Sequence, residues 1–319
     1  MERGTRAAFR LDPQAAVLLD DLESGVAPPS STLSVATGRE LLEDLFAVED
    51  PEPVGAVTDL EIRGPNGPVP LRIYVPDGEG PFPLVVFFHG GGWVRGSLDA
   101  YEGPCRLLTN EVDCVVVSVG YRRAPEHPFP AGVEDCYRAA EWTATHAADL
   151  QGDPDRVAVA GDSAGGNLAA AVALAVRDRD GPDFAHQLLV YPSVNPPSVR
   201  WFDSYDECGT GYFLEMDSIE WYLEQYLAGR ADVGNAYAFP LRARSLSRLP
   251  SATVLTAGFD PLRDEGAAYA DRLESAGVDV ERLHYENQIH GFCSLYEHID
   301  EGRTAIADAA ASLKDGLPE

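Results

Sequence analysis

The sequence has a single lysine, Lys314, among its 24 basic residues, and 52 acidic residues outnumber them to give a net charge of −28. Such a chain repels phosphate groups, so neither nucleic acid nor an anionic membrane surface is an expected partner. The acidic residues are spread along the chain instead of forming a tail. This pattern, with lysine nearly absent, predicts a protein adapted to a salt-rich cytoplasm.

Long apolar runs and paired cysteines are also missing. No run approaches the roughly 18 apolar residues that mark a transmembrane helix, and the polar start of the chain lacks the apolar segment of a signal peptide. The five cysteines are odd in number and include no C-x-x-C pair. We therefore expect reduced thiols in a cytoplasmic protein, and neither a disulfide framework nor a zinc site.

Strand and helix patterns alternate along most of the 319 residues. The predicted strands are residues 57–63, 69–75, 84–88, 114–119, 157–160, 187–191, 252–257 and 278–285. The predicted helices between and after them are residues 101–110, 132–147, 167–176, 265–276 and 302–313. Strands that are joined by helices pair in parallel. We therefore expect an α/β fold with a mostly parallel, eight-stranded sheet and helices on both faces.

Residues 1–50 precede this alternation and have helical patterns. Asp12 followed by Pro13 is a typical helix start, and an apolar face that includes Val17 follows it. A second short helix is expected over residues 38–46. Such a lead-in cannot join the sheet, so it is predicted to pack over another part of the fold.

Residues 193–248 interrupt the alternation and are rich in aromatic side chains. We expect them to join residues 1–50 in a helical cap, with aromatic faces that line an apolar acyl pocket. The catalytic core would then consist of residues 51–192 and 249–319. The alternative for residues 193–248 is a packed helical insert without a role in ligand binding.

The segment Gly161–Gly165 has the spacing G-x-S-x-G with Ser163 at its centre. A buried-strand pattern precedes it and a helical pattern follows it. A serine on such a turn adopts a strained conformation with its hydroxyl pushed out of the sheet, and a Cβ at Gly161 or Gly165 would collide with the neighbouring element. Ser163 is therefore the candidate nucleophile. The alternative is an ordinary tight turn built from small residues.

A serine nucleophile needs a histidine base and an acid that orients the base. Asp260 and His290 each lie just after a predicted strand, at the edge where parallel strands gather a site. Their order after the serine is the one expected of an α/β-hydrolase. Asp264 is the alternative acid. Five further histidines are predicted to be structural or surface residues: His127, His146, His186, His284 and His298.

The loop His89–Trp93, with the sequence H-G-G-G-W, directly follows the buried strand predicted at residues 84–88. Attack on an ester carbonyl creates an oxyanion, which preorganised N–H donors stabilise. Three glycines let the backbone amides approach the substrate, and the residue after the serine, Ala164, supplies another N–H. The sequence thus predicts an oxyanion hole, the alternative being a merely flexible glycine loop.

Six segments, in order, resemble the hormone-sensitive-lipase family of carboxylesterases, also called the bacterial family IV esterases. They are Leu11–Pro13, His89–Trp93, Tyr121–Asp135, Gly161–Gly166, Asp260–Gly266 and His290–Phe292. The resemblance implies an α/β-hydrolase fold with a helical cap. It also implies the triad Ser163, Asp260 and His290 and the oxyanion donors Gly91, Gly92 and Ala164. Arg123 departs from the pattern, because an apolar residue is common at that place.

The function that the resemblance implies is carboxylesterase activity on short acyl chains through a covalent acyl-enzyme, with no metal and no organic cofactor. The ligand would be a small ester, and the resemblance also points to a homodimer. An amidase or deacetylase with the same triad is one alternative. Another is a ligand-binding receptor on this fold, as in the plant gibberellin receptors, although such receptors lack the catalytic histidine and His290 is present here.

Salt is expected to stabilise this protein, because a net charge of −28 makes the folded chain repel itself. The Debye length falls from about 10 Å at 0.1 M salt to about 3 Å at 1 M, where neighbouring carboxylates largely cease to interact. The midpoint of thermal unfolding should therefore rise from dilute buffer into molar KCl. Equal midpoints, with full activity in dilute buffer, would contradict the predicted adaptation to salt.

Overall fold

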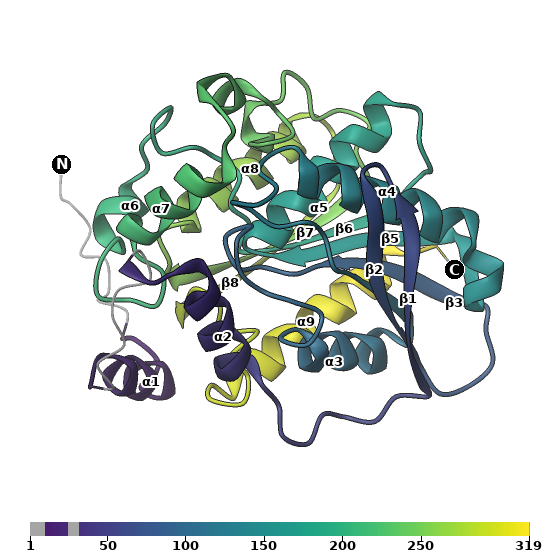
Figure 1. Ribbon diagram of the computed structural model, residues 1–319, viewed down its shortest axis with the longest axis horizontal. Coiled ribbons are helices and arrows are strands. Elements are labelled where there is room, and N and C mark those ends of the chain that lie inside the picture. The colour runs from purple at the N-terminus through teal and green to yellow at the C-terminus, as the bar shows by residue number, and fades with distance from the viewer. Residues whose placement is uncertain (1–9, 25–31, 319) are drawn as a thin grey trace.

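The computed structural model describes residues 10–24 and 32–318, which include one sheet in the order β1-β2-β4-β3-β5-β6-β7-β8 (Figure 1). The strands are β1 (Ala56–Gly64), β2 (Gly67–Val75), β3 (Phe82–Phe88), β4 (Val115–Val119), β5 (Gly152–Asp162), β6 (His186–Val190), β7 (Ser251–Phe259) and β8 (Val280–Ile289). The α-helices are α1 (Pro13–Ser24), α2 (Val35–Phe46), α3 (Glu102–Val112), α4 (Ala131–Thr145), α5 (Ala164–Asp178), α6 (Asp203–Glu207), α7 (Met216–Tyr226), α8 (Arg263–Ser275) and α9 (Glu301–Gly316).

Pairing in the sheet changes direction only near its first edge. β1 and β2 form an antiparallel hairpin, and β2 also pairs antiparallel with β4. From β4 onward every pair of neighbours is parallel. The expected mostly parallel, eight-stranded α/β-hydrolase sheet is therefore confirmed. Its parallel strands end at the same edge, which is where such sheets gather a site.

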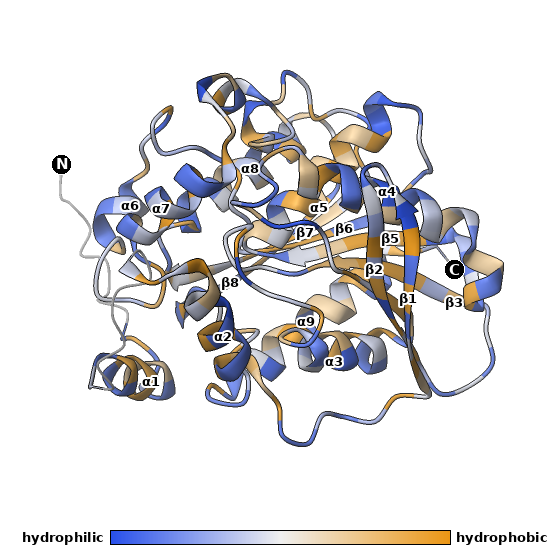
Figure 2. Cartoon of the chain, viewed as in Figure 1, coloured by the Kyte–Doolittle hydropathy of each residue, from blue (hydrophilic) through white to orange (hydrophobic). Residues whose placement is uncertain are grey.

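The helices cover both faces of the sheet, as expected. In Figure 1, α4, α5 and α8 lie on one side of the strands, and α3 and α9 lie on the other. Alternate residues of β3 supply the two cores: Leu84 packs in the core with α4, α5 and α8, and Val85 packs in the core with α3 and α9. Figure 2 shows apolar colour along central strands such as β3 and β5, and mixed colour on the helices, which have one face toward water.

The lead-in is helical in the described residues, although the details differ from expectation. Asp12 caps α1, because its carboxylate accepts hydrogen bonds from the first-turn N–H groups of Gln14 (2.8 Å) and Ala15 (3.1 Å). Val17, expected on the apolar face, is 59% exposed, so that expectation was wrong. The face of α1 that contacts the rest of the fold is narrower than the apolar face of the helix. Residues 1–9 and 25–31 of the predicted cap lie outside the described residues.

Several elements begin earlier than their sequence patterns indicated, and α2 and β5 show the reasons. α2 starts at Val35 rather than residue 38, because the Ser34 hydroxyl accepts a hydrogen bond from Thr37 N–H and caps the helix. β5 starts at Gly152 rather than residue 157, because its first residues extend the sheet beside β3. Among residues 10–24 and 32–318, no helix is both long enough and apolar enough to cross a membrane.

A glycine in the first turn of α5 lets this helix approach β3. A Cβ on Gly165 would lie 1.9 Å from the carbonyl oxygen of Phe88, a backbone atom that cannot move aside. Gly165→Ala should therefore lower the unfolding free energy by about 3 kcal/mol or more, the upper end for overpacking.

Gly229→Ala is the matched control, because a Cβ there would meet no atom within 4 Å. Urea unfolding of the two variants and the wild type makes the comparison. If Gly165→Ala were as stable as Gly229→Ala, the close approach of α5 to β3 would not be as described.

Candidate active site

The turn between β5 and α5 holds Ser163 in a strained conformation. Its φ of 55° and ψ of −118° are unusual for a residue with a side chain. A Cβ on Gly161 would lie 2.4 Å from the backbone of Gly165, so the expectation that neither glycine tolerates a side chain is confirmed. Ser163 N–H donates to the carbonyl of Val190 at the end of β6 (2.8 Å), which ties the turn to the sheet.

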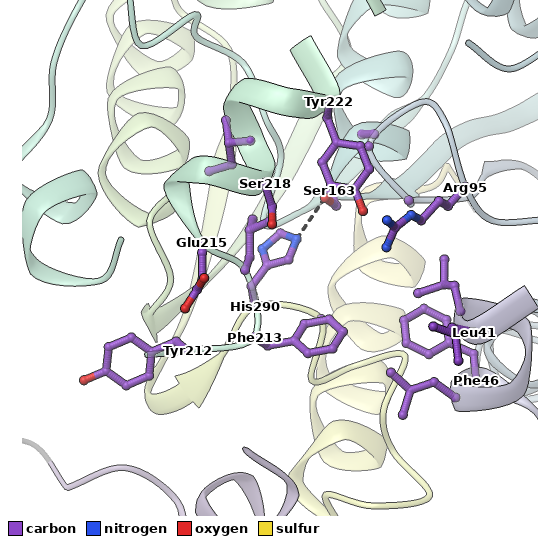
Figure 3. Close-up of a pocket in the computed structure, with 18 of the residues that line it drawn as sticks. Leu41, Phe46, Arg95, Ser163, Tyr212, Phe213, Glu215, Ser218, Tyr222 and His290 are labelled. Atoms are coloured by element: carbon purple, nitrogen blue, oxygen red, sulfur yellow. Dashed lines mark hydrogen bonds between the residues drawn. The ribbon is translucent and has the colours of Figure 1, made fainter. Parts of the chain in front are cut away.

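A chain of hydrogen bonds links the three residues expected to form a triad. The Ser163 hydroxyl donates to Nε2 of His290 over 2.8 Å (Figure 3). Nδ1–H of His290 donates to Oδ2 of Asp260, also over 2.8 Å. Leu262 N–H holds the other carboxylate oxygen, Oδ1 of Asp260, over 2.8 Å. Asp260 is fully buried and His290 is 5% exposed, so water competes little for these bonds.

The alternative acid, Asp264, does not contact this histidine. Its carboxylate accepts hydrogen bonds from Ser204 N–H (2.9 Å) and from the guanidinium of Arg263 (2.7 Å). The structure therefore brings Asp260, and not Asp264, to His290.

The glycine loop after β3 lies beside the serine. Gly91 and Gly92 have φ angles of +106° and +60°, and a Cβ on Gly92 would lie 2.4 Å from the ring of Tyr222. The carbonyl of Gly91 accepts hydrogen bonds from the N–H groups of Val94 and Arg95, and these bonds close a tight turn. Both glycines line the same cavity as Ser163 and Ala164.

A buried carboxylate that the sequence reasoning missed joins this loop to the nucleophile turn. Asp162 accepts hydrogen bonds from Gly90 N–H (2.7 Å) and from the Tyr101 hydroxyl (2.9 Å). Burial raises the pKa of Asp162 to about 6, although both bonds favour the charged form. The sequence did contain a signal for this role. Asp162 directly precedes Ser163 at the end of a buried strand, and a charged side chain that is buried there needs a hydrogen-bond partner.

His89, the first residue of the glycine loop, has a structural role. Its ring is buried, stacks on Tyr121 with centroids 4.3 Å apart, and donates from Nδ1 to the carbonyl of Gly90. Burial lowers the pKa of His89 to about 3, so the ring is neutral. His186 is also buried, between two hydroxyl groups. His298 is exposed, as expected for a surface residue, and it also lines the cavity.

A cavity of about 630 Å³ opens over Ser163 and His290. Of the ten aromatic residues in the 193–248 segment, three line it, namely Tyr212, Phe213 and Tyr222. Apolar side chains of the lead-in helices also line it: Leu19, Leu22, Leu41, Leu42, Leu45 and Phe46. Figure 3 shows Leu41 and Phe46 on the side opposite Tyr212. The wall is therefore more aliphatic than the aromatic pattern predicted.

Metal-binding groups do not gather in the described part of the chain. Within residues 10–24 and 32–318, no cluster of three or more His, Cys, Asp or Glu side chains could hold a metal ion. All five cysteines are buried and unpaired.

Glu265, near the start of α8, anchors the insertion beside the triad loop. Its carboxylate accepts hydrogen bonds from the N–H groups of Val194 (2.6 Å) and Asn195 (3.0 Å), and from the hydroxyl of Tyr205. The side chain is fully buried, and burial raises its pKa to about 8. Sequence reasoning missed this role because all of its partners lie about 60 or 70 positions earlier in the chain.

Comparison with known proteins agrees with this geometry. Residues 85–294 match the model of a protein family that has the α/β-hydrolase fold. The chain is 45% identical to the carboxylic ester hydrolase LipN of Mycobacterium tuberculosis over 247 residues, which cover 76% of this chain and 65% of LipN. It is 34% identical to an ethyl acetate hydrolase of Pseudomonas putida over 320 residues, which cover 94% of this chain and 98% of that protein.

This chain is also similar, in both sequence and fold, to a solved structure. The ester-hydrolase EH1AB1 from the metagenome of Lake Arreo, complexed with a derivative of bipyridine phosphonate, is 39% identical, with a TM-score of 0.91 over 96% of this chain and 98% of that one. The chain belongs to the carboxylesterase family of α/β hydrolases. The resemblance to the hormone-sensitive-lipase family is thereby confirmed, and the protein is a serine hydrolase.

Ionisation of Glu265 should make this hydrolase less stable as the pH rises. Its pKa of about 8 in the folded chain exceeds the ordinary value of 4.5, so the folded state binds the extra proton between these values. The unfolding free energy therefore falls as the pH rises through this range. Glu265→Gln should flatten the fall, leaving a smaller slope at the acidic end from Asp162, whose pKa is also raised.

Denaturant unfolding at about pH 5 and about pH 8 measures this slope. Glu79→Gln is the matched control, because Glu79 is exposed and the same chemical change there removes no buried carboxyl. A slope in Glu265→Gln equal to that of the wild type would show that Glu265 does not govern the pH dependence.

Proposed function

We propose that this protein hydrolyses esters of short-chain carboxylic acids through a covalent acyl-enzyme. The observation that carries the proposal is the hydrogen-bonded series from Ser163 through His290 to Asp260 at the base of an apolar cavity. The distances of 2.8 Å are suited to proton transfer from the hydroxyl to the imidazole.

In the first half of the reaction Ser163 Oγ attacks the ester carbonyl while Nε2 of His290 takes its proton. Asp260 keeps Nδ1 of the imidazole protonated and stabilises the imidazolium that forms. The oxyanion accepts hydrogen bonds from the N–H groups of Gly91, Gly92 and Ala164, and Ala164 begins a helix whose N-terminal end favours negative charge. The imidazolium then protonates the leaving alcohol, and Ser163 retains the acyl group.

In the second half, water replaces the alcohol. His290 removes a proton from this water, which attacks the acyl carbonyl, and the same oxyanion donors stabilise the second tetrahedral intermediate. Collapse of that intermediate returns the proton to Ser163 Oγ and releases the carboxylic acid. The cycle consumes one water and restores the enzyme, and no step in it uses a metal or an organic cofactor.

The lead-in helices and residues 193–248 act as the cap over this site. Support comes from the cavity, whose wall combines Leu41 and Phe46 of α2 with Tyr222 of α7. An apolar wall favours an alkyl chain over a charged group. The preference for short chains is supported by the relative from Pseudomonas putida, which is named for ethyl acetate.

The wider setting follows from the composition. A small ester is the ligand, and the acidic, lysine-poor chain is suited to a salt-rich cytoplasm. A homodimer is the oligomer that the family resemblance favours. The expectations for location and oligomer remain predictions.

Ser163→Ala should abolish ester turnover without unfolding the protein, because it deletes one hydroxyl at the surface of the turn. Loss of a triad nucleophile lowers kcat by several powers of ten, about 10⁶ in a well-studied case. The assay uses 4-nitrophenyl esters of graded acyl length, with thermal unfolding to check the fold. An anilide of the best acyl group separates esterase from amidase activity.

Asp264→Asn is the matched control, because Asp264 lies four positions from Asp260 and does not contact His290. It should keep most of the activity that Ser163→Ala loses. Residual activity in Ser163→Ala above about one hundredth of the wild-type value would contradict the assignment of Ser163 as nucleophile. A preference for long acyl chains would contradict the proposed substrate class.

A further inference from the structure

Arg39, in the middle of α2, reaches from the cap to the loop that follows the glycine turn. Its Nε donates to the carbonyl of Val94 over 2.8 Å, and its Nη2 donates to the carbonyl of Ala124 over 3.0 Å. The sequence separations are 55 and 85 positions. One guanidinium therefore joins three segments that are distant in the sequence.

The remaining donors of the same guanidinium bind Glu126 through two parallel hydrogen bonds of 2.8 and 2.7 Å. These bonds lower the pKa of Glu126 to about 2, so the carboxylate is charged at neutral pH. A planar guanidinium suits a paired carboxylate and nearby carbonyls at the same time, whereas the ammonium of lysine has no such fixed fork. The ion pair with Glu126 thus lies beside the bonds to the two carbonyls, which Arg39 makes directly.

The two carbonyls lie in the segment that shapes the proposed oxyanion hole. The N–H groups of Val94 and Arg95 both donate to the carbonyl of Gly91, over 3.1 and 2.8 Å. Ala124 N–H donates to the carbonyl of Trp93 over 3.0 Å. Val94 is thus held on one side by the Gly91 turn and on the other by Arg39. Any shift of this carbonyl moves the backbone that orients the N–H groups of Gly91 and Gly92.

A second arginine holds the next part of the loop. Arg123, the residue that departs from the family pattern, donates from Nη1 to the carbonyl of Gly96. Helix α2 also packs directly on this loop, because a Cβ on Gly38 would lie 2.5 Å from Nε of Arg95. The loop after the glycine turn is therefore in contact with the cap helix at more than one point.

We propose that Arg39 is a positioning residue that couples the docking of α2 to the geometry of the oxyanion hole. This inference rests on the proposed esterase function. Leu41 and Phe46 of the same helix line the substrate cavity, while Arg39 holds the carbonyl of Val94. The helix that forms the apolar wall of the cavity therefore also supports the N–H donors of Gly91 and Gly92. Arg39 acts through Val94 and does not touch the substrate.

The test compares Arg39→Gln with Glu126→Gln. Arg39→Gln removes both the ion pair and the bonds to the carbonyls of Val94 and Ala124. Glu126→Gln removes only the charge of the carboxylate and leaves those bonds available. Each variant is assayed for kcat and KM on the best short-chain ester and for inhibition by a trifluoromethyl ketone, which adds to the serine and places an oxyanion between the N–H donors.

For Arg39→Gln we expect kcat to fall about 10- to 100-fold, the effect of misplacing a catalytic group by a fraction of an ångström to 1 Å. KM should change little, and the inhibition constant of the ketone should rise by the same factor as kcat/KM falls. Glu126→Gln should keep kcat within about twofold of the wild type, because an exposed ion pair contributes little. Arg39→Lys should lie between them, since an ammonium can reach one carbonyl but not both.

Two results would overturn the inference. One is a lower unfolding midpoint in Arg39→Gln with kcat and ketone inhibition unchanged, which would make Arg39 a structural strap only. The other is an equal loss of kcat in both variants. If Arg39→Gln does not fold, Arg39→Lys with wild-type kcat and ketone inhibition overturns the inference equally. Absence of ester turnover in the wild type would contradict the proposed function itself, so the two failures are distinguishable.

Discussion

The close approach of α5 to the end of β3 is the constraint on which the rest of the site depends. Gly165 leaves no room for a side chain against the carbonyl of Phe88, and the turn before it holds Ser163 in a strained conformation. The same contact brings the end of β3, and with it Gly91, beside the nucleophile. This close packing thus places the hydroxyl of Ser163, the candidate nucleophile, beside the loop expected to receive the negative charge.

Buried carboxylates then connect the pieces that this packing brings together. Asp162 joins the nucleophile turn to the glycine loop, Asp260 orients His290, and Glu265 holds the start of the insertion. Each accepts at least two hydrogen bonds, as a buried carboxylate must if burial is not to be prohibitively unfavourable. The many acidic residues of this chain therefore divide into a few with fixed partners inside and a majority that lie at the surface.

Sequence patterns predicted most of the sheet because buried parallel strands are short apolar runs between helices. They predicted boundaries less well where a long-range partner extends an element, as for β5 beside β3. Val17 was misplaced because helical periodicity does not reveal how much of a face finds a partner. Arg39 and Glu265 escaped notice because each functions through backbone groups more than 50 positions away, which helical periodicity does not reveal.

The sequence alone determined the fold class and the identity of the candidate nucleophile and base, because strand ends and small-residue turns are local signals. It left Asp260 and Asp264 both available. Only the tertiary structure decided between them, by setting one carboxylate 2.8 Å from His290 and pairing the other with Arg263. The walls of the cavity were decided in the same way, because contacts between segments far apart in the chain depend on packing and not on local pattern.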